Sequence, residues 1–122
     1  MRIHHVALRT GDLPRLEAFY AGVLGLPVVR RAPGRVWLAA ADDASAPGAI
    51  LMLEQREQGE PEVPVNYKEF LAFAIAASDR AARREALERA NVAIEAETDF
   101  TLYFRDPDGR RVGLSHYVLD WP

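Results

Sequence analysis

The chain repeats one order of secondary structure, and this repeat constrains the fold more than any single motif. A strand with period-two alternation, an amphipathic helix and three shorter strands are predicted within residues 1–56. The same order is predicted again within residues 69–122, about 65 residues further along. The segment between them, 57–68, is polar and contains Gly and Pro without periodicity, so we predict a linker there. The fold class predicted is therefore α+β, with one βαβββ module in each half. Each four-stranded sheet alone would leave one face bare, so the two modules are expected to pair into one domain with a cup-shaped eight-stranded mixed sheet.

Start and stop signals bound the two predicted helices. Asp12 is placed to cap the first helix, and Gly25 follows its last apolar residue. Ser78 or Asp79 is expected to cap the second helix, which should end before Asn91. Gly and Pro predict the turns Pro33–Gly34, Asp42–Gly48 and Asp106–Gly109. The predicted strands are Met1–Arg9, Leu26–Arg31, Val36–Ala40, Ala49–Gln55, Phe70–Ala76, Val92–Glu97, Phe100–Arg105 and Arg110–Tyr117.

Composition narrows the class of protein. The absence of cysteine excludes disulfides, a thiolate nucleophile and cysteine-ligated metals. With 15 Lys and Arg against 18 Asp and Glu, the chain lacks the basic excess typical of nucleic-acid binding, and its arginine pairs are interpreted as solvated surface. No apolar run approaches the ~18 residues of a membrane span, and the first residues lack the apolar core of a signal peptide. We therefore expect a cytoplasmic protein with neither nucleic-acid nor membrane partners.

Three stretches of sequence carry a resemblance to a known family. They are His5–Leu13 continuing to Leu26, Leu71–Ile75 ahead of the second helix, and Tyr103–Leu114 with its Asp-Pro-Asp-Gly turn. Together with the repeat, they resemble the vicinal oxygen chelate superfamily, which includes glyoxalase I, bleomycin-resistance proteins, fosfomycin-resistance enzymes and extradiol dioxygenases. The resemblance implies a glyoxalase-like fold, a homodimer and a small-molecule ligand bound inside the cup.

The resemblance also implies where a metal ion would be held. Metal-dependent members take one ligand from the first strand and one from the last strand of each half. The first-strand histidine is retained as His5, whereas Met52, Phe70 and Gly113 occupy the other three positions. Divalent ions need three or four nitrogen, oxygen or sulfur donors, and the thioether of Met suits only soft ions. We therefore expect no cofactor and no divalent metal at these positions.

Other residues are expected to line the pocket. Alternation places Ala7 and Arg9 on the face of His5, and Glu54 on the face of Met52. Tyr103 could hydrogen-bond a ligand, and Arg105 at the end of the same strand could bind an anionic group. Trp37 could line the cup or a subunit boundary, and the apolar tail Tyr117–Trp121 is expected to pack across one of them. The full set of expected pocket residues is His5, Ala7, Arg9, Trp37, Met52, Glu54, Phe70, Tyr103, Arg105 and Gly113.

Four functions remain open at this stage. The leading hypothesis is a metal-free homodimer that binds or sequesters a small molecule, with an apolar lining and a few polar anchors. A metal-dependent lyase or dioxygenase would need a displaced site formed by His5, Glu54 and His116, with a β-bulge to turn His116 inward. A metal-free acid/base enzyme would use His5 and Tyr103. A dimeric interaction module with a filled cup is the fourth.

Overall fold

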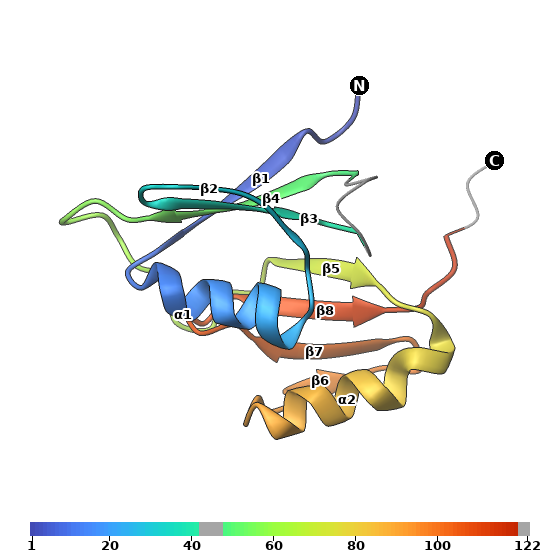
Figure 1. Cartoon of the computed structure of the whole chain (residues 1–122). Coiled ribbons are helices and arrows are strands. Elements are labelled where there is room, and N and C mark those ends of the chain that lie inside the picture. Colours follow the sequence, from blue (N-terminus) through green and yellow to red (C-terminus); the bar gives the residue numbers. More distant parts are fainter. Residues whose placement is uncertain (42–47, 120–122) are drawn as a thin grey trace. The chain divides into compact units, whose positions relative to one another are not determined.

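Two units, each with its own sheet, make up the chain. The computed structural model describes residues 1–41 and 48–119. Contacts divide the chain into Met1–Glu62 and Val63–Pro122, with the boundary inside the segment predicted as a linker. Each unit has one four-stranded mixed sheet, with strand order β1-β4-β3-β2 in the first and β5-β8-β7-β6 in the second (Figure 1). The α+β class and the βαβββ order of each half are therefore confirmed.

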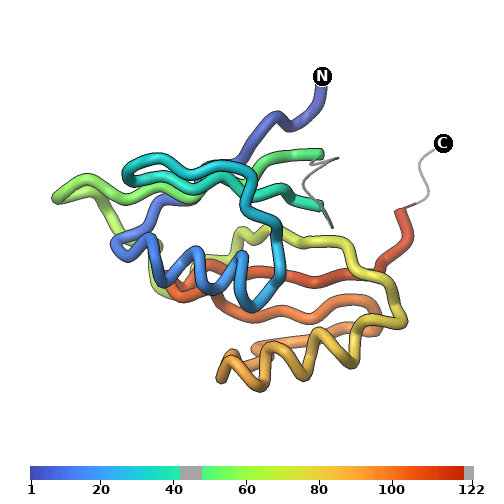
Figure 2. The backbone as a smooth tube through the Cα atoms, in the orientation of Figure 1, coloured from blue at the N-terminus to red at the C-terminus, as the bar shows by residue number. Residues whose placement is uncertain are grey.

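The same path is traced by each half of the backbone (Figure 2). A first strand is followed by a helix, and three antiparallel strands then return so that the last one pairs in parallel with the first. The first unit consists of β1 (His5–Thr10), α1 (Leu13–Glu17), η1 (Ala18–Val23), β2 (Val28–Ala32), β3 (Arg35–Ala39) and β4 (Ile50–Gln55). The second consists of β5 (Phe70–Ala74), η2 (Ala77–Asp79), α2 (Arg80–Arg89), β6 (Ala96–Glu97), β7 (Thr101–Arg105) and β8 (Arg111–Ser115).

The first helix begins and ends as predicted but changes its winding. The Asp12 side chain accepts a hydrogen bond from the backbone N–H of Arg15, and Gly25 takes the left-handed conformation at φ 77°. From Ala18 the helix continues as the π-helix η1, closed by a bond from the N–H of Leu24 to the carbonyl of Phe19. Apolar spacing predicted one helix, because a change from i+4 to i+5 bonding leaves the same residues on the buried side.

The predicted start of the second helix is confirmed in position, because Asp79 is the N-cap residue of α2, but its side chain does not cap the helix. Neither Ser78 nor Asp79 caps it from an extended position, because both lie in the 3₁₀ turn η2 that precedes α2. The backbone of Asp79 is already helical, with φ −93° and ψ −6°, and its side chain makes no capping hydrogen bond. At the other end, Asn91 has the predicted positive φ, 58°.

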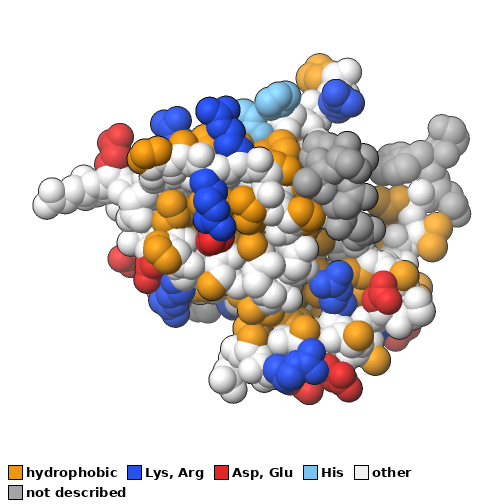
Figure 3. Space-filling view, viewed as in Figure 1, with side chains coloured by type: hydrophobic (Ala, Val, Ile, Leu, Met, Phe, Trp, Pro, Cys, Tyr) orange, Lys and Arg blue, Asp and Glu red, His pale blue; other side chains and the backbone are white. Residues whose placement is uncertain are grey.

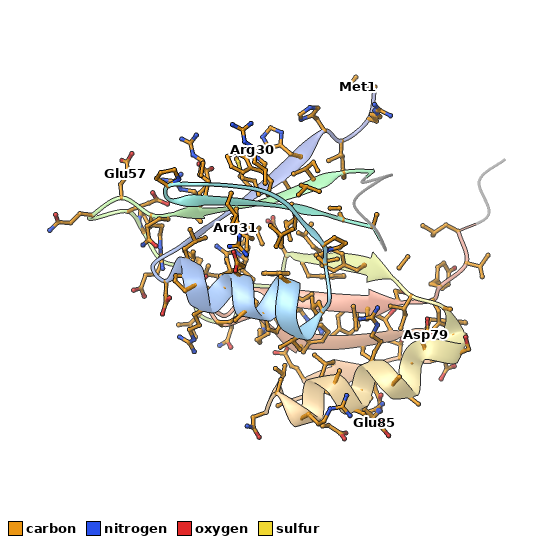
Figure 4. The ribbon with its side chains drawn as sticks, viewed as in Figure 1. Met1, Arg30, Arg31, Glu57, Asp79 and Glu85 are labelled. Carbon is orange, nitrogen blue, oxygen red and sulfur yellow. The ribbon has the colours of Figure 1, made fainter. Side chains whose placement is uncertain are left out.

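Alternation along the strands separates a buried from an open face in the first sheet. Leu8, Leu38, Leu51 and Leu53 are 8% exposed or less, and β4 contacts α1 on this side. The opposite face, here called the first open face, carries His5, Ala7, Arg9, Arg30, Arg35, Trp37, Met52 and Glu54. Figure 4 shows the split within β2, where Arg30 and its neighbour Arg31 point to opposite sides of the sheet.

The second sheet has the same two faces. Leu102, Phe104, Val112 and Leu114 are 3% exposed or less and form the core together with Leu87 of α2. The second open face carries Phe70, Ala72, Tyr103, Arg105, Arg111 and Gly113. The predicted strand Val92–Glu97 shrinks to the two residues of β6, which lie beside α2 (Figure 1). The predicted turn at Asp42–Gly48 lies outside the described residues except for Gly48, as do the last residues of the apolar tail.

Candidate functional site

The four positions that the resemblance assigned to metal ligands form two equivalent pairs. In the first sheet, His5 lies opposite Ile50 and Met52 lies opposite Ala7, two residues further along the parallel pair β1–β4. In the second sheet, Phe70 lies opposite Arg111 and Gly113 lies opposite Ala72, two residues further along β5–β8. Because the register offset is the same, His5 corresponds to Phe70 and Met52 to Gly113. Each pair therefore lies on the open face of its own sheet.

His5 is exposed at the start of β1. Its Nδ1 lies 2.9 Å from the Nδ1 of His4, and the two rings meet edge to face. This contact needs one ring to donate and the other to accept, so it selects a tautomer of each imidazole. The predicted position of His5 on the open face is compatible with a contact to a ligand.

Glu54 is surrounded by basic groups. Its carboxylate lies 3.1 Å from Nε of Arg35 and 3.5 Å from Arg9, and its side chain is 14% exposed. Arg9 in turn donates two hydrogen bonds to Glu60, which raises the pKa of Arg9 and lowers the pKa of Glu60. The charges of Glu54 and Arg9 are therefore balanced by partners within the first unit.

An apolar strip crosses the middle of the first open face. Trp37 lies opposite Met52, which lies opposite Ala7, so the three side chains follow one another across β3, β4 and β1. The guanidinium of Arg30 lies 5.1 Å from the centroid of the Trp37 ring and covers its outer side. The register thus places Trp37 on the open face, which alternation alone left undecided.

An arginine stacked on two aromatic rings dominates the second open face. The guanidinium carbon of Arg111 lies 4.2 Å from the centroid of the Tyr103 ring and 5.6 Å from that of Phe70. The two rings meet edge to face with centroids 5.1 Å apart. Tyr103 and Phe70 were expected in the pocket, but Arg111 was not, because the pair Arg110-Arg111 was interpreted as solvated surface. The signal that identifies it is its period-two spacing from Gly113.

Arg105 has a structural role instead of the expected contact with an anion. It donates two hydrogen bonds to Glu95 and others to the carbonyls of Tyr67 and Gly109. These bonds tie β7 to the segment before β5 and to the turn before β8. The carboxylate of Glu95 also lies 3.4 Å from Nε of Arg111, so Glu95 holds both arginines at this end of the sheet.

The Glu95 cluster should make the stability of the protein sensitive to acid. The hydrogen bonds from Arg105 lower the pKa of Glu95 from its ordinary value of 4.5. A carboxylate with a lowered pKa in the folded state contributes stability above its unfolded pKa, and that stability is lost as pH falls through the folded value. We expect the melting temperature to fall as the pH drops below about 4.5, and to fall less steeply in Glu95→Gln, as measured by thermal unfolding at several pH values. The exposed helix residue Glu85 gives the control Glu85→Gln; an equal slope in the two variants would contradict this assignment.

His116 points away from the second open face. It follows β8 directly, and its Nε2 lies 3.2 Å from Nη1 of Arg80 at the start of α2. Its ring also packs against Phe100. β8 pairs with β5 and β7 in unbroken register from Arg111 to Ser115, without the bulge that the displaced metal site requires. The set of His5, Glu54 and His116 therefore has no support from the strand geometry.

The described part of the chain offers no donor cluster for a metal. Among residues 1–41 and 48–119, no three His, Asp or Glu side chains are grouped so that they could hold an ion. No described helix has the length and apolarity to cross a membrane. On the face drawn in Figure 3, basic and acidic side chains are interspersed with apolar ones.

Comparisons with known proteins agree with this fold. The family model of the Glyoxalase/Bleomycin resistance protein/Dioxygenase superfamily matches residues 2–114. The fosfomycin resistance protein FosX from Mesorhizobium loti is 17% identical, with a TM-score of 0.78, covering 96% of this chain and 92% of that one. A glyoxalase/dioxygenase from Nostoc punctiforme is 22% identical, with a TM-score of 0.76 and coverage of 93% and 88%. Glyoxalase I from Leishmania major is 24% identical, with a TM-score of 0.73 and coverage of 94% and 86%. Among curated proteins, none matches the chain.

Proposed function

The chain belongs to the Glyoxalase/Bleomycin resistance protein/Dioxygenase superfamily, and on this premise we propose that it binds a small molecule without a metal ion, as a cytoplasmic homodimer. The observation that carries this proposal is the chemistry of the two equivalent pairs on the open faces. Of His5, Met52, Phe70 and Gly113, only the imidazole is a good ligand for a divalent ion. One nitrogen cannot replace the three or four donors that such an ion needs, so the residues present do not fit a metal centre.

The residues in place of metal ligands suit an organic ligand. Met52 continues the apolar strip with Trp37 and Ala7, and Phe70 continues the aromatic cluster with Tyr103. Binding sites for small molecules are mostly apolar and aromatic with a few polar groups that orient the ligand. His5 would supply such a polar group on the first open face, and Arg111 would supply one on the second.

Exposed apolar residues in the second unit support the homodimer. Tyr117, Val118 and Leu119 are between 59% and 70% exposed, and Phe100 beside Tyr117 is 44% exposed. A run of large apolar side chains in water is typical of an interface with another protein chain. A second copy of the chain is the partner that the family resemblance suggests.

Thermal unfolding with two sets of additives tests the metal-free proposal. Excess Zn²⁺, Ni²⁺, Mn²⁺ or Mg²⁺ should leave the melting temperature unchanged, because an ion that does not bind the folded state cannot stabilise it. A library of small aromatic compounds should contain members that raise it, since any ligand selective for the folded state does so. Protein without an affinity tag, freed of metal by chelation, is the appropriate sample. A rise with a divalent ion at low stoichiometry would contradict the proposal and favour a metal-dependent enzyme.

A further inference from the structure

We propose that the second open face binds a small aromatic carboxylate, with Arg111 as the group that holds the carboxylate and the rings of Phe70 and Tyr103 as the surface that holds the aromatic part. This inference rests on the proposed function, because it assumes a small organic ligand at these faces. It adds the chemical class of that ligand, an anion with a planar aromatic body.

The geometry of Arg111 is suited to a planar anion. Its guanidinium lies 4.2 Å from the centroid of the Tyr103 ring. Stacking of this kind occupies a face of the guanidinium and leaves its N–H groups directed outward in the plane. A carboxylate accepts two such parallel N–H groups at once, which makes it the preferred partner of a pre-oriented arginine.

The environment of Arg111 leaves its charge incompletely matched. The side chain is only 20% exposed, and its buried Nε has no hydrogen-bond partner in the part of the chain that the structure describes. Its ion-pair partner is Oε2 of Glu95 at 3.4 Å, which forms no hydrogen bond with it, while Arg105 donates two hydrogen bonds to Oε1 of the same carboxylate. The buried Nε itself is out of reach of a ligand, but a guanidinium without a full set of acceptors is incompletely neutralised, so an anion at its exposed part would be stabilised.

The net charge at this end of the sheet favours an anion over a cation. Arg105 and Arg111 bring two positive charges against the single carboxylate of Glu95, and Lys68 adds a third positive charge near Glu95. A cationic ligand would meet repulsion from at least one uncompensated guanidinium. The first open face differs, since Arg9, Arg35 and Glu54 are held together with Glu60 in one network.

The residues beside Arg111 suit an aromatic body. Phe70 is 45% exposed and meets Tyr103 edge to face, so it offers ring surface for a third aromatic group. Next along the same two strands, Ala72 and Gly113 pair with each other and carry the smallest side chains of this face. Ala72 is exposed, whereas Gly113 is covered by the Tyr103 ring, so a ligand ring would lie over Ala72 and against the edge of Tyr103.

Calorimetric titration of the full chain with three probes of matched size tests this inference. Benzoate should bind about tenfold or more tightly than neutral benzamide, because a charge-assisted pair is about twice as strong as a neutral hydrogen bond. Protonated benzylamine should bind most weakly. Arg111→Gln should weaken benzoate about tenfold and change benzamide by less than about threefold. Arg89→Gln, on the exposed side of α2, is the matched control and should change neither.

A second variant keeps the test independent of the stability of Arg111→Gln. Glu95→Gln removes the carboxylate that is paired with Arg111, so it should tighten benzoate binding severalfold and increase the ratio of benzoate to benzamide affinity. Equal affinity for benzoate and benzamide, or no benzoate binding at millimolar concentration, would overturn the assignment of an aromatic carboxylate. Preferred binding of benzylamine would overturn it as well, while leaving metal-free binding of a small molecule in place. A failure of the proposed function itself is recognised separately, by stabilisation with a divalent ion.

Discussion

Replacing the three unsuitable side chains together, as Met52→Glu, Phe70→His and Gly113→Glu, is expected to create divalent-metal binding, which we propose that the natural chain lacks. With His5, the variant carries two imidazoles and two carboxylates at the four positions that the family resemblance assigns to metal ligands, whereas the natural chain retains one such ligand. We expect Zn²⁺ or Ni²⁺ to bind at least about a hundredfold more tightly than to the natural chain, as measured by calorimetric titration. The result depends on the correspondence between these positions and the ligand positions of metal-dependent members.

The backbone at Gly113 accepts a side chain at its first carbon. A Cβ there would lie 3.4 Å from the Cβ of Ala72 and from Cγ2 of Thr101 and 3.5 Å from Cε1 of Tyr103, which is close van der Waals contact without overlap. The matched control carries Met52→Gln, Phe70→Asn and Gly113→Gln, which have similar size but poor affinity for divalent ions. If the control binds metal as well as the carboxylate variant does, the correspondence of positions is wrong.

Asp106→Ala is expected to destabilise the protein by about 3 kcal/mol. Asp106 is 4% exposed, and its carboxylate accepts hydrogen bonds from the backbone N–H groups of Asp108 and Arg110 and from the Arg110 guanidinium. Removing it leaves two backbone donors of the turn and the half-buried guanidinium of Arg110 without this acceptor, and each such loss costs about 1 kcal/mol or more. Urea unfolding measures the change as a shift of the midpoint.

The same substitution should also disturb the pairing of β7 with β8, which carries residues of the second open face. The Asp106–Gly109 turn, in which Gly109 has a φ of 90°, joins β7 to β8 and so sets the register of Tyr103 opposite Gly113. Asp99→Ala, at an exposed bend of the same unit, is the control and should cost less than about 0.5 kcal/mol. A comparable loss in both variants would show that the carboxylate of Asp106 has no special part in this turn.

Alternation along a strand and the residues that tolerate turns predicted most strands, both helices and the two faces of each sheet, because these signals depend only on residues that are close in the sequence. Period-two alternation placed His5 with Ala7 and Arg9, and Met52 with Glu54, and the register of β1 and β4 confirms both sets. Positive φ at Gly25, Asn91 and Gly109 followed from the residues that tolerate it. These features need no knowledge of which strands pair.

Features that depend on pairing or on competing partners could not be predicted in this way. Arg105 and Arg111 both lie on the second open face, yet only the structure shows that Glu95 and two carbonyls occupy the donors of Arg105. Arg110, just before β8, pairs with Asp106, whereas Arg111, the first residue of β8, stacks on Tyr103. Their position beside a turn had indicated solvated surface for both. Asp79 failed as a cap because a 3₁₀ turn had already brought it into the helix.

The claim on which the account depends is that the retained imidazole of His5 has lost its three partners and binds no divalent ion alone. The most direct measurement is elemental analysis of tag-free protein purified without chelators from metal-supplemented cells. We predict far less than one equivalent of zinc, nickel, manganese, iron or copper per chain, unchanged by His5→Ala. One equivalent of a single metal, lost in His5→Ala, would contradict the account.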